Sequence, residues 1–381
     1  MNGFPAGGPT IGVEEEFFLV DPGTGELVPR NREVVDAAAA FGVDVGLELS
    51  PAQVETATPV CHSMREVRDR VVELRAVAAA AALQAGARLL AVGVPVAGAP
   101  TGRVTDTPRY RRMAGGYGAM ITGREISGCH VHVGVPDRET AVQVSNHLRP
   151  WLPVLLGLTA NSAVHHGRDT GFASWRAVET SRWPCAGPPP AWTSAAEYDT
   201  TVARMIDSGT VLDEGMVYWD IRPSAHLPTI EVRVSDVPAT VNETALLAAL
   251  VRALVSASVR KVHAGETAPQ VPDLLLRAAY FRAAREGLTG RWLDVTTGRL
   301  ATPTQLLTEL LKRLRPELEA FGEYPRVAKL LARQLTSGNG AGWQQALWQQ
   351  HRDLPELVAT AARQTLIDSQ PALPVPRHLT A

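Results

Sequence analysis

Several segments of this sequence alternate apolar residues with ionisable ones, and side chains alternate between the two faces of a β-strand. In residues 11–20, IGVEEEFFLV, Glu14 and Glu16 lie on one face, while Glu15 lies on the other with Val13 and Phe17. A buried carboxylate costs several kcal/mol unless its charge is compensated. The segment therefore predicts a strand whose Glu14 and Glu16 face water or a cation. For Glu15 we expect an edge position or an ion pair with a helix.

The same alternation recurs in CHVHVGV (129–135), VYWDIR (217–222) and IEVRVS (230–235), and carboxylates also mark the strand-like segments 45–49 and 53–57. The ionisable residues of these segments are Glu48, Glu55, His130, His132, Asp220, Arg222, Glu231 and Arg233. A half-solvated antiparallel sheet would alternate in the same way. Its outer face would then mix lysine, threonine, serine and glutamine. These faces contain no lysine and concentrate carboxylate, imidazole and guanidinium groups, which favours a functional face.

The chemistry of this face indicates divalent metal and phosphate. Hard cations prefer carboxylate oxygens, so Mg²⁺ or Mn²⁺ would keep Glu14 and Glu16 ionised. Arg233 follows Glu231 on its strand face, and a guanidinium makes paired, charge-assisted bonds to phosphate. Together these groups suggest phosphoryl transfer from a nucleotide. The sequence has no GxGxxG after a strand and no GxxxxGK[ST], so neither a Rossmann turn nor a P-loop would hold that nucleotide.

Composition limits the classes of partner and compartment. The 381 residues carry a formal net charge of −2, which gives no reason to expect nucleic acid or an anionic membrane as a partner. The three cysteines, Cys61, Cys129 and Cys185, are far apart, so we expect neither a disulfide framework nor a thiolate zinc site, and a cytoplasmic location. The N-terminus has no secretory pattern, and no apolar stretch reaches the ~18–20 residues of a membrane span.

The order of predicted elements indicates an α+β fold with an antiparallel sheet. Irregular connections between strands argue against a βαβ repeat. Strands are predicted near 11–20, 45–49, 53–57, 88–94, 129–135, 217–222 and 230–235, and helices near 32–41, 64–86, 138–162, 194–207 and 242–263. We expect loops at 95–108 and 184–192. The chain beyond about 271 should be almost wholly helical, with a cap at Thr302 or Thr304 and a break at Pro316.

With these residues described, the chain resembles the glutamate–cysteine ligase type 2 family of carboxylate–amine ligases over roughly residues 11–260. The likeness rests on GVEEEFFLVDPGTGEL, SPAQVETATPVC, DTPRYRRM, SGCHVHVGVPDRETAV, LRPWLPVLLGLTANS, GRDTGFASWR, SRWPCAGPPP and YWDIRPS…PTIEVRVSDVP. The resemblance implies a glutamine-synthetase-like fold, in which an antiparallel sheet forms the floor of an ATP–metal site. It implies one domain over 1–381, with a core at about 11–260 and a helical portion at about 271–370. Helices would pack on the back of the sheet.

The resemblance also implies roles for individual residues. The expected Mg²⁺ or Mn²⁺ ligands are Glu14, Glu16, Glu48, Glu55, His130 and Glu231. Arg233 would act on the transferring phosphate, Arg176 would hold the acid substrate, and His132 and Arg222 would line the same cavity. A plain alternative for Arg176 is a solvated loop arginine. The segment NSAVHH (161–166) departs from the usual family pattern, and we expect His165 and His166 to be loop residues at the pocket entrance.

The activity implied by the family is ATP-dependent amide formation between a carboxylate, by likeness the γ-carboxylate of L-glutamate, and an amine, by default L-cysteine. An acyl phosphate would be the intermediate. Two alternatives remain: a metal-dependent hydrolase built on His130 and His132, and a non-catalytic nucleotide- or metabolite-binding homologue. The extent of helix in the last third, together with the family likeness, predicts a homodimer or larger assembly.

Overall fold

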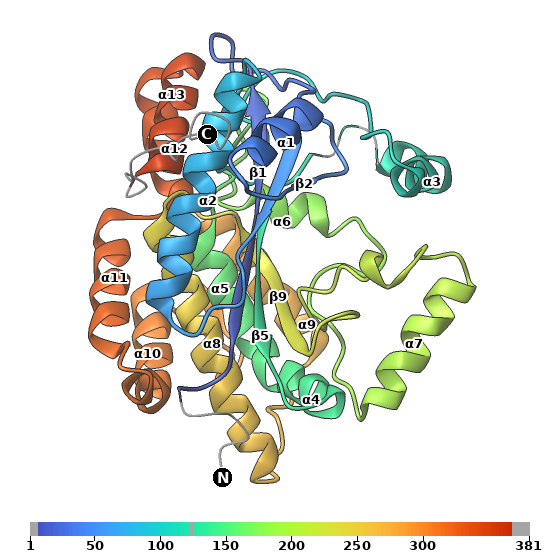
Figure 1. Cartoon of the computed structure of the whole chain (residues 1–381). Coiled ribbons are helices and arrows are strands. Elements are labelled where there is room, and N and C mark those ends of the chain that lie inside the picture. The colour runs from blue at the N-terminus through green and yellow to red at the C-terminus, as the bar shows by residue number, and fades with distance from the viewer. Residues whose placement is uncertain (1–6, 122, 124, 368–381) are drawn as a thin grey trace.

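A seven-stranded sheet forms the centre of the computed structural model, which describes residues 7–121, 123 and 125–367 (Figure 1). Its strands are β1 (Ile11–Val20), β2 (Val45–Leu47), β3 (Gln53–Ala57), β4 (Arg88–Leu90), β5 (Gly128–Gly134), β8 (Ile221–Pro223) and β9 (Thr229–Asp236). Two short hairpins stand apart, β6 (Val164–His165) with β7 (Arg168–Asp169) and β10 (Trp292–Asp294) with β11 (Arg299–Ala301).

Helices make up most of the remaining structure. Up to residue 207 they are α1 (Asn31–Ala40), α2 (Met64–Gln84), α3 (Pro108–Tyr117), α4 (Arg138–Leu148), α5 (Leu152–Thr159), α6 (Trp175–Thr180) and α7 (Ala195–Asp207). The later ones are α8 (Val241–His263), α9 (Asp273–Glu286), α10 (Pro303–Ala320), α11 (Tyr324–Ser337), α12 (Gly340–His351) and α13 (Leu354–Leu366). Short 3₁₀ turns lie at η1 (Gly118–Met120), η2 (Arg149–Trp151) and η3 (Glu214–Met216).

The sheet is antiparallel and brings the ionisable strand faces together. Its order is β2-β3-β1-β5-β9-β8, and β4 pairs with the end of β1. In the register, Glu14 of β1 is opposite His130 of β5, and His132 is opposite Glu231 of β9. Residues opposite each other in a ladder have their side chains on the same face. The α+β prediction is confirmed, and the pairing explains why groups from distant segments share one surface.

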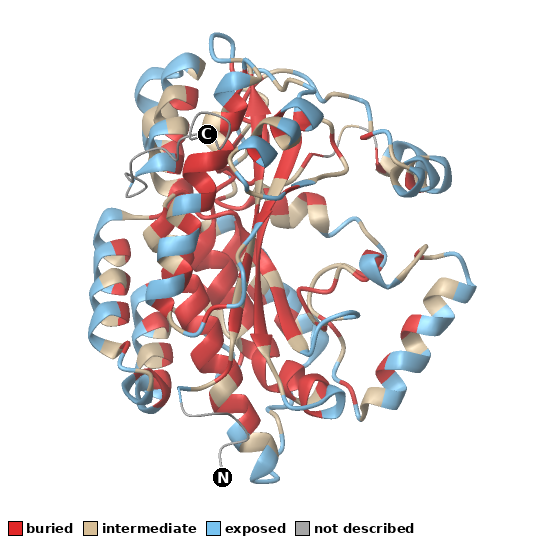
Figure 2. Cartoon of the chain, viewed as in Figure 1, coloured by how far each residue is buried: buried red, intermediate tan, exposed pale blue. Residues whose placement is uncertain are grey.

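One face of the sheet is covered by helices and the other looks onto the site. Figure 1 shows α2, α8, α10 and α11 on one side, with α3 and α7 across the other. Val13 of β1 and Val131 of β5 pack with α8 residues such as Leu246 in the main apolar core. Figure 2 colours buried residues red, and most of the sheet and of α8 is red. Each such buried side chain contributes about 1.5–3 kcal/mol to folding. This rigid back layer holds the opposite face in place.

Three segments differ from the sequence prediction because of proline or loop chemistry. The helix expected at 138–162 divides into α4 and α5 around Pro150, which lacks the N–H that a continuous helix needs. Pro316, expected to break the helix, instead lies inside α10. Leu314 and Leu318 are buried on either side of it, and their packing outweighs a proline cost of about 3 kcal/mol.

The strand expected at 217–222 begins only at Ile221, because η3 and the following turn take up the preceding residues. The β10–β11 hairpin interrupts the expected helical third, and Thr302 caps α10 as predicted. The three cysteines are buried and form no disulfide. Among the described residues, no helix combines the length and apolar character required to cross a bilayer.

Candidate active site

A cavity of about 410 Å³ opens on the ionisable face of the sheet. All ten residues singled out in the sequence line it: Glu14, Glu16, Glu48, Glu55, His130, His132, Arg176, Arg222, Glu231 and Arg233. They come from β1, β3, β5, β8, β9, α6 and the turn after β2. The geometry therefore brings these ten residues together, while the role of each residue stays a prediction.

Glu14 and Glu16 reach into the cavity from alternate positions of β1. Glu14 Oε2 lies 3.1 Å from His130 Nδ1, and its Oε1 lies 3.3 Å from His132 Nε2. Burial alone would raise the pKa of Glu14, but the imidazoles of His130 and His132 hold it below the ordinary range. Glu16 Oε2 accepts a hydrogen bond of 2.6 Å from the backbone N–H of Gly128. Both carboxylates are thus fixed by neighbours on β5.

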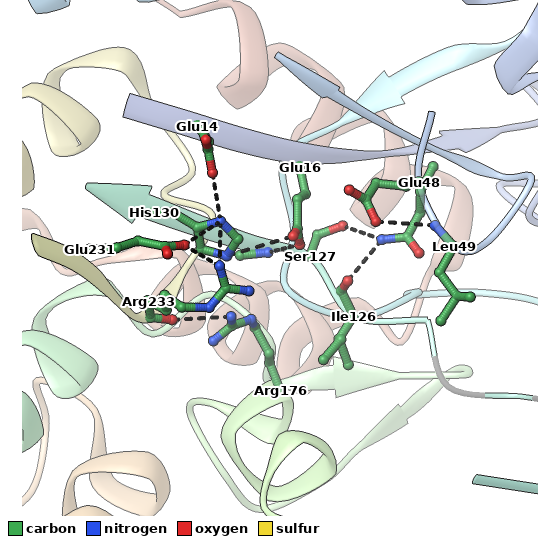
Figure 3. Close-up of polar contacts among 12 residues, drawn as sticks. Glu14, Glu16, Glu48, Leu49, Ile126, Ser127, His130, Arg176, Glu231 and Arg233 are labelled. Atoms are coloured by element: carbon green, nitrogen blue, oxygen red, sulfur yellow. Dashed lines mark hydrogen bonds and ion pairs between the residues drawn. The ribbon is translucent and has the colours of Figure 1, made fainter. Parts of the chain in front are cut away.

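His130 lies between two clusters of possible metal ligands (Figure 3). One cluster joins it to Glu14 and Glu231 and the other to Glu16 and Glu55, and within each the ligand atoms lie within 4.8 Å of one another. Among the described residues the buried Nε2 atoms of His130 and His132 form no hydrogen bond of good geometry, and each has a carboxylate oxygen nearby, at 3.6 Å and 3.3 Å. A divalent cation would satisfy such atoms, and two carboxylates with one imidazole suit Mg²⁺ or Mn²⁺. The residues present therefore fit the metal that the resemblance implies.

Glu48 and Glu55 show the cost of gathering carboxylates without a compensating charge. Burial, reinforced by the neighbouring Glu16, raises the pKa of Glu48 to about 8. Burial and the charge of Glu48 raise the pKa of Glu55 well above its ordinary value. Glu48 Oε2 accepts one bond of 3.1 Å, from its neighbour Leu49 N–H. A bound cation would remove the mutual repulsion, which is a second sign that the cluster fits metal.

Glu231 joins the acidic cluster to two arginines. Its carboxylate forms an ion pair with Arg233 and accepts a bond of 2.7 Å from Arg222 Nε. Burial would raise the pKa of Glu231, and the two guanidinium groups lower it instead. Arg222 also donates to the carbonyls of Glu214, Gly215 and Val217, at 3.2, 3.2 and 2.7 Å. Arg222 thus fastens the η3 loop as well as lining the cavity.

Arg176 is a buried residue of α6 and not a solvated loop arginine. Its Nη1 lies 3.4 Å from the carbonyl of Val234, its Nη2 lies 3.3 Å from that of Arg233, and its Nε is buried without a partner. Ser174 caps α6, and its hydroxyl donates to Asp236 at 2.8 Å. The start of α6 is therefore anchored to the end of β9.

Two predictions about histidine have different outcomes. His132 lines the cavity, with Nδ1 3.0 Å from the hydroxyl of Thr229. His165 and His166 do not line it, contrary to the expectation for the pocket entrance. His165 ends the short strand β6, where Nδ1 lies 3.2 Å from the carbonyl of Pro95. Backbone pairing in this hairpin directs the two rings toward each other instead.

Sequence reasoning assigned no role to several other residues of the cavity wall. These are Arg109, Tyr110, Trp183, Tyr218, Asp220 and His226. Tyr218 and Asp220 alternate with Arg222 in VYWDIR, so their shared face was visible in the sequence. Arg109 and Tyr110 come from α3, which lies on the side of the sheet away from α8, and no periodicity predicts that they line the cavity.

Comparison with solved structures identifies the class of fold. A glutamate–cysteine ligase of Francisella tularensis, solved in complex with AMP, superposes with a TM-score of 0.67 at 14% identity over 97% of this chain and 90% of that one. A bifunctional glutathione synthetase of Pasteurella multocida gives a TM-score of 0.69 at 15% identity, over 96% of this chain and 53% of that one. At these identities the likeness shows the fold, which is that of the glutamate–cysteine ligases.

Sequence comparison identifies the family. The model of glutamate–cysteine ligase family 2 matches residues 10–362. A Mycolicibacterium smegmatis protein, provisionally named glutamate–cysteine ligase 2-3, is 49% identical over 361 residues, which cover 94% of this chain and 99% of that protein. A Nocardia farcinica relative, provisionally named glutamate–cysteine ligase 2-1, is 51% identical over 358 residues, 94% of each chain. The chain belongs to glutamate–cysteine ligase family 2, and it is an enzyme of the ligase class.

Proposed function

We propose that the protein is an ATP-dependent ligase that joins the γ-carboxylate of L-glutamate to an amine, with L-cysteine as the default. The observation that carries this proposal is one cavity that is lined both by an acidic, imidazole-containing cluster and by Arg176 and Arg233. Phosphoryl transfer needs this combination, because catalysis there consists mostly of positioning and charge neutralisation. The names of the relatives support the choice of glutamate and cysteine.

The proposed reaction has two steps. A carboxylate oxygen of the acid attacks the γ-phosphorus of ATP, and ADP leaves with the electron pair of the broken P–O bond. The amine nitrogen then attacks the carbonyl carbon of the acyl phosphate, inorganic phosphate leaves, and the nitrogen loses one proton. Both steps place negative charge on oxygens that need fixed positive partners.

The residues of this chain divide the work by position. Glu14, Glu16, Glu55, His130 and Glu231 would hold Mg²⁺ or Mn²⁺, with Glu48 beside them. When bound, the cations would neutralise phosphate charge. Arg233 is partly buried, forms an ion pair with Glu231, lies beside His130, and would contact the transferring phosphate. Arg176 projects from the neighbouring α6 and would hold the α-carboxylate of the acid.

A metal-dependent hydrolase remains the second candidate, because His130 and His132 share one face. Each of the two ligand clusters found among the described residues has a single imidazole and two carboxylates, which favours Mg²⁺ or Mn²⁺ over zinc. A non-catalytic nucleotide binder would have little use for so many metal ligands.

The test is ADP release, measured over all pairs of candidate acids and amines with Mg²⁺ present. We expect ADP to appear only when acid, amine, ATP and metal are all supplied, with a stoichiometric amide product. Zinc-dependent hydrolysis of an amide without ATP would support the hydrolase instead. ATP binding in isothermal titration, without ADP release for any pair, would support the binder.

A further inference from the structure

Two opposite charges line the cavity without an ion-pair partner. Arg176 is 5% exposed and Asp220 is 6% exposed, and both belong to the cavity wall. Among the described residues, neither side chain lies within ion-pair distance of an opposite charge. The other arginines of the wall differ, because each is paired with a carboxylate: Arg109, Arg138, Arg222 and Arg233. In the described part of the chain Glu48 and Glu55 of the same wall also form no ion pair, so what distinguishes Arg176 and Asp220 is that an unpaired cation and an unpaired anion are neighbours.

The backbone of Arg233 holds these two residues on the same side of β9. The N–H of Arg233 donates to the carbonyl of Asp220 at 2.7 Å, and its carbonyl accepts from Arg176 Nη2 at 3.3 Å. Asp220 and Arg176 are thus both bonded to the backbone of one residue, Arg233, and form no ion pair with each other. The hydroxyl of Tyr280, from α9, interacts with the carboxylate of Asp220. Burial raises the pKa of Asp220 to about 6 and the Arg176 charge opposes that rise, consistent with two neighbouring groups that interact across a gap.

Arg176 donates to two backbone carbonyls and Asp220 interacts with the Tyr280 hydroxyl, but among the described residues neither buried group has an ion-pair partner, which is costly for a charge that has lost its hydration. A ligand that carries a carboxylate and an ammonium on one carbon would satisfy both. Arginine presents a planar fork that binds carboxylate with two bonds, and a carboxylate such as that of Asp220 accepts from an ammonium. The unpaired Nε of Arg176 supplies one of the donors that this contact needs.

We propose that Arg176 and Asp220 bind the α-amino acid group of the acid substrate, Arg176 its α-carboxylate and Asp220 its α-ammonium. The inference rests on the proposed ligase function and narrows it. Asp220 becomes a residue that determines specificity, and the acid must be an α-amino acid whose side chain carries the reacting carboxylate.

Three related acids test the proposal. Glutarate is glutamate without its α-ammonium, and 4-aminobutyrate is glutamate without its α-carboxylate. Binding of each acid in the presence of ATP analogue and Mg²⁺ is measured by isothermal titration, and kcat/KM is measured by ADP release with a fixed amine. For the wild-type protein we expect a preference for glutamate of roughly 10- to 100-fold over either analogue, the range for a hydrogen bond to a charged group.

The variants should lose this preference selectively. Asp220→Asn should lower the affinity and kcat/KM for glutamate by roughly 10- to 100-fold and leave both values for glutarate nearly unchanged. Arg176→Gln should lower the affinity and kcat/KM for glutamate by a similar factor and leave both values for 4-aminobutyrate nearly unchanged. Asp207→Asn, an exposed carboxylate at the end of α7, is the matched control and should change none of the three acids. Circular dichroism checks that each variant folds.

Two results would overturn the assignment while leaving the ligase intact. One is wild-type protein that uses or binds glutarate as well as glutamate. The other is an Asp220→Asn protein whose affinities for glutamate and for glutarate fall by the same factor, which would give Asp220 a purely structural role. Absence of ADP release with every acid would instead contradict the proposed function. In that case the titrations still decide whether Asp220 recognises an ammonium.

Discussion

Glu231 shows how single residues set the charge of this site. It is 2% exposed and paired with Arg222 and Arg233, while the imidazoles of His130 and His132 lie within 3.8 Å of its Oε1. One carboxylate therefore links metal-ligand candidates to the guanidinium that we propose for the transferring phosphate. Because Arg233 is held from the protein side, its position does not depend on the substrate. Such preorganised charge is the main source of transition-state stabilisation in polar reactions.

Replacing Arg233 tests this assignment. Arg233→Ala should lower kcat by about 10²–10³, the range for losing one transition-state donor, with a smaller change in KM. Arg233→Lys should rescue only part of the loss, because a point charge does not make a two-pronged contact. Steady-state ADP release gives both constants. A variant with normal kcat and only a raised KM for the acid would mean that the roles of Arg233 and Arg176 are exchanged or wrong.

At this scale the sequence predicted which residues gather but not how they are bonded. Period-two alternation placed Glu14, His130 and Glu231 on one face, and the sheet register brings them together. The same alternation put Asp220 on the cavity face without revealing that it lacks a cation partner. Glu15 was expected at an edge or with a helix, and it pairs with Arg75 of α2, a residue 60 positions away. Long-range pairing of this kind has no local signal.

Among the elements, β1 is anchored through Glu15, which lies between the cavity residues Glu14 and Glu16 and points to the opposite face of the sheet. Arg75 donates to both oxygens of Glu15, from Nε at 2.9 Å and from Nη2 at 2.6 Å. It also donates to the carbonyls of Pro238, Ala239 and Thr365, which precede α8 or end α13. The charge of Glu15 is thus compensated, and β1, α2, α8 and α13 share one buried junction.

Removing Arg75 should destabilise the fold strongly. Arg75→Met leaves the buried Glu15 carboxylate unpaired, which typically costs about 3–5 kcal/mol of unfolding free energy. Urea denaturation followed by circular dichroism measures the change. Arg70→Met is the control, because its ion pair with Glu73 is exposed on the same helix and should matter little. An Arg75→Met protein within about 1 kcal/mol of wild type would contradict the account.

Gly128 of β5 lies between two site residues: its N–H donates to Glu16, and its Cα faces the guanidinium of Arg176. A single methyl group at this position should therefore disturb substrate binding. A Cβ at this position would lie 2.3 Å from Nη2 of Arg176. Gly128→Ala should therefore displace that guanidinium and raise KM for the acid by roughly 10²-fold, as small misplacements in a site do. Gly115→Ala in α3, where a Cβ meets nothing within 4 Å, is the control. Unchanged KM in Gly128→Ala protein would remove Arg176 from acid binding.

The elements themselves were largely predictable where their periodicity was long. The strand at 53–57 and the long helices α2 and α8 match the expected segments closely. The β10–β11 hairpin was missed because three-residue strands show no usable alternation. The continuation of α10 through Pro316 was missed because tertiary packing, which no local rule contains, decides it.

Association of the whole molecule stays a prediction. Leu274 and Phe281 are 81% and 52% exposed, and they lie seven residues apart on α9, on one side of the helix. Such apolar exposure is consistent with the expected homodimer through helical contacts. Light scattering at micromolar concentration should give a mass near twice 40.8 kDa. A particle of 40.8 kDa would contradict the expectation.

The stability of the whole molecule should depend on pH in a way that tests whether the carboxylate cluster binds metal. Glu48 and Glu55 have raised pKa values in the folded protein, about 8 for Glu48. Their contribution to stability is full below the ordinary glutamate pKa of about 4.3 and is lost as pH rises toward 8. Glu14 and Glu231 have lowered pKa values, so their contribution is lost only on acidification. Between pH 6 and 8 the cluster is therefore governed by Glu48 and Glu55.

A cation that binds the ionised carboxylates reverses this loss, and protons compete with it at lower pH. The melting temperature of EDTA-treated protein should fall from pH 6 to pH 8, and Mn²⁺ should raise it more at pH 8. A free Mn²⁺ concentration of 100 times its Kd adds about 2.7 kcal/mol to the free energy of unfolding. Asp220 and Glu243 also have raised pKa values, about 6 and about 7, so the diagnostic quantity is the difference made by Mn²⁺. Glu55→Gln should shrink that difference, and NaCl of equal ionic strength should not reproduce it. An equal or smaller gain at pH 8 would show that these carboxylates do not bind the cation.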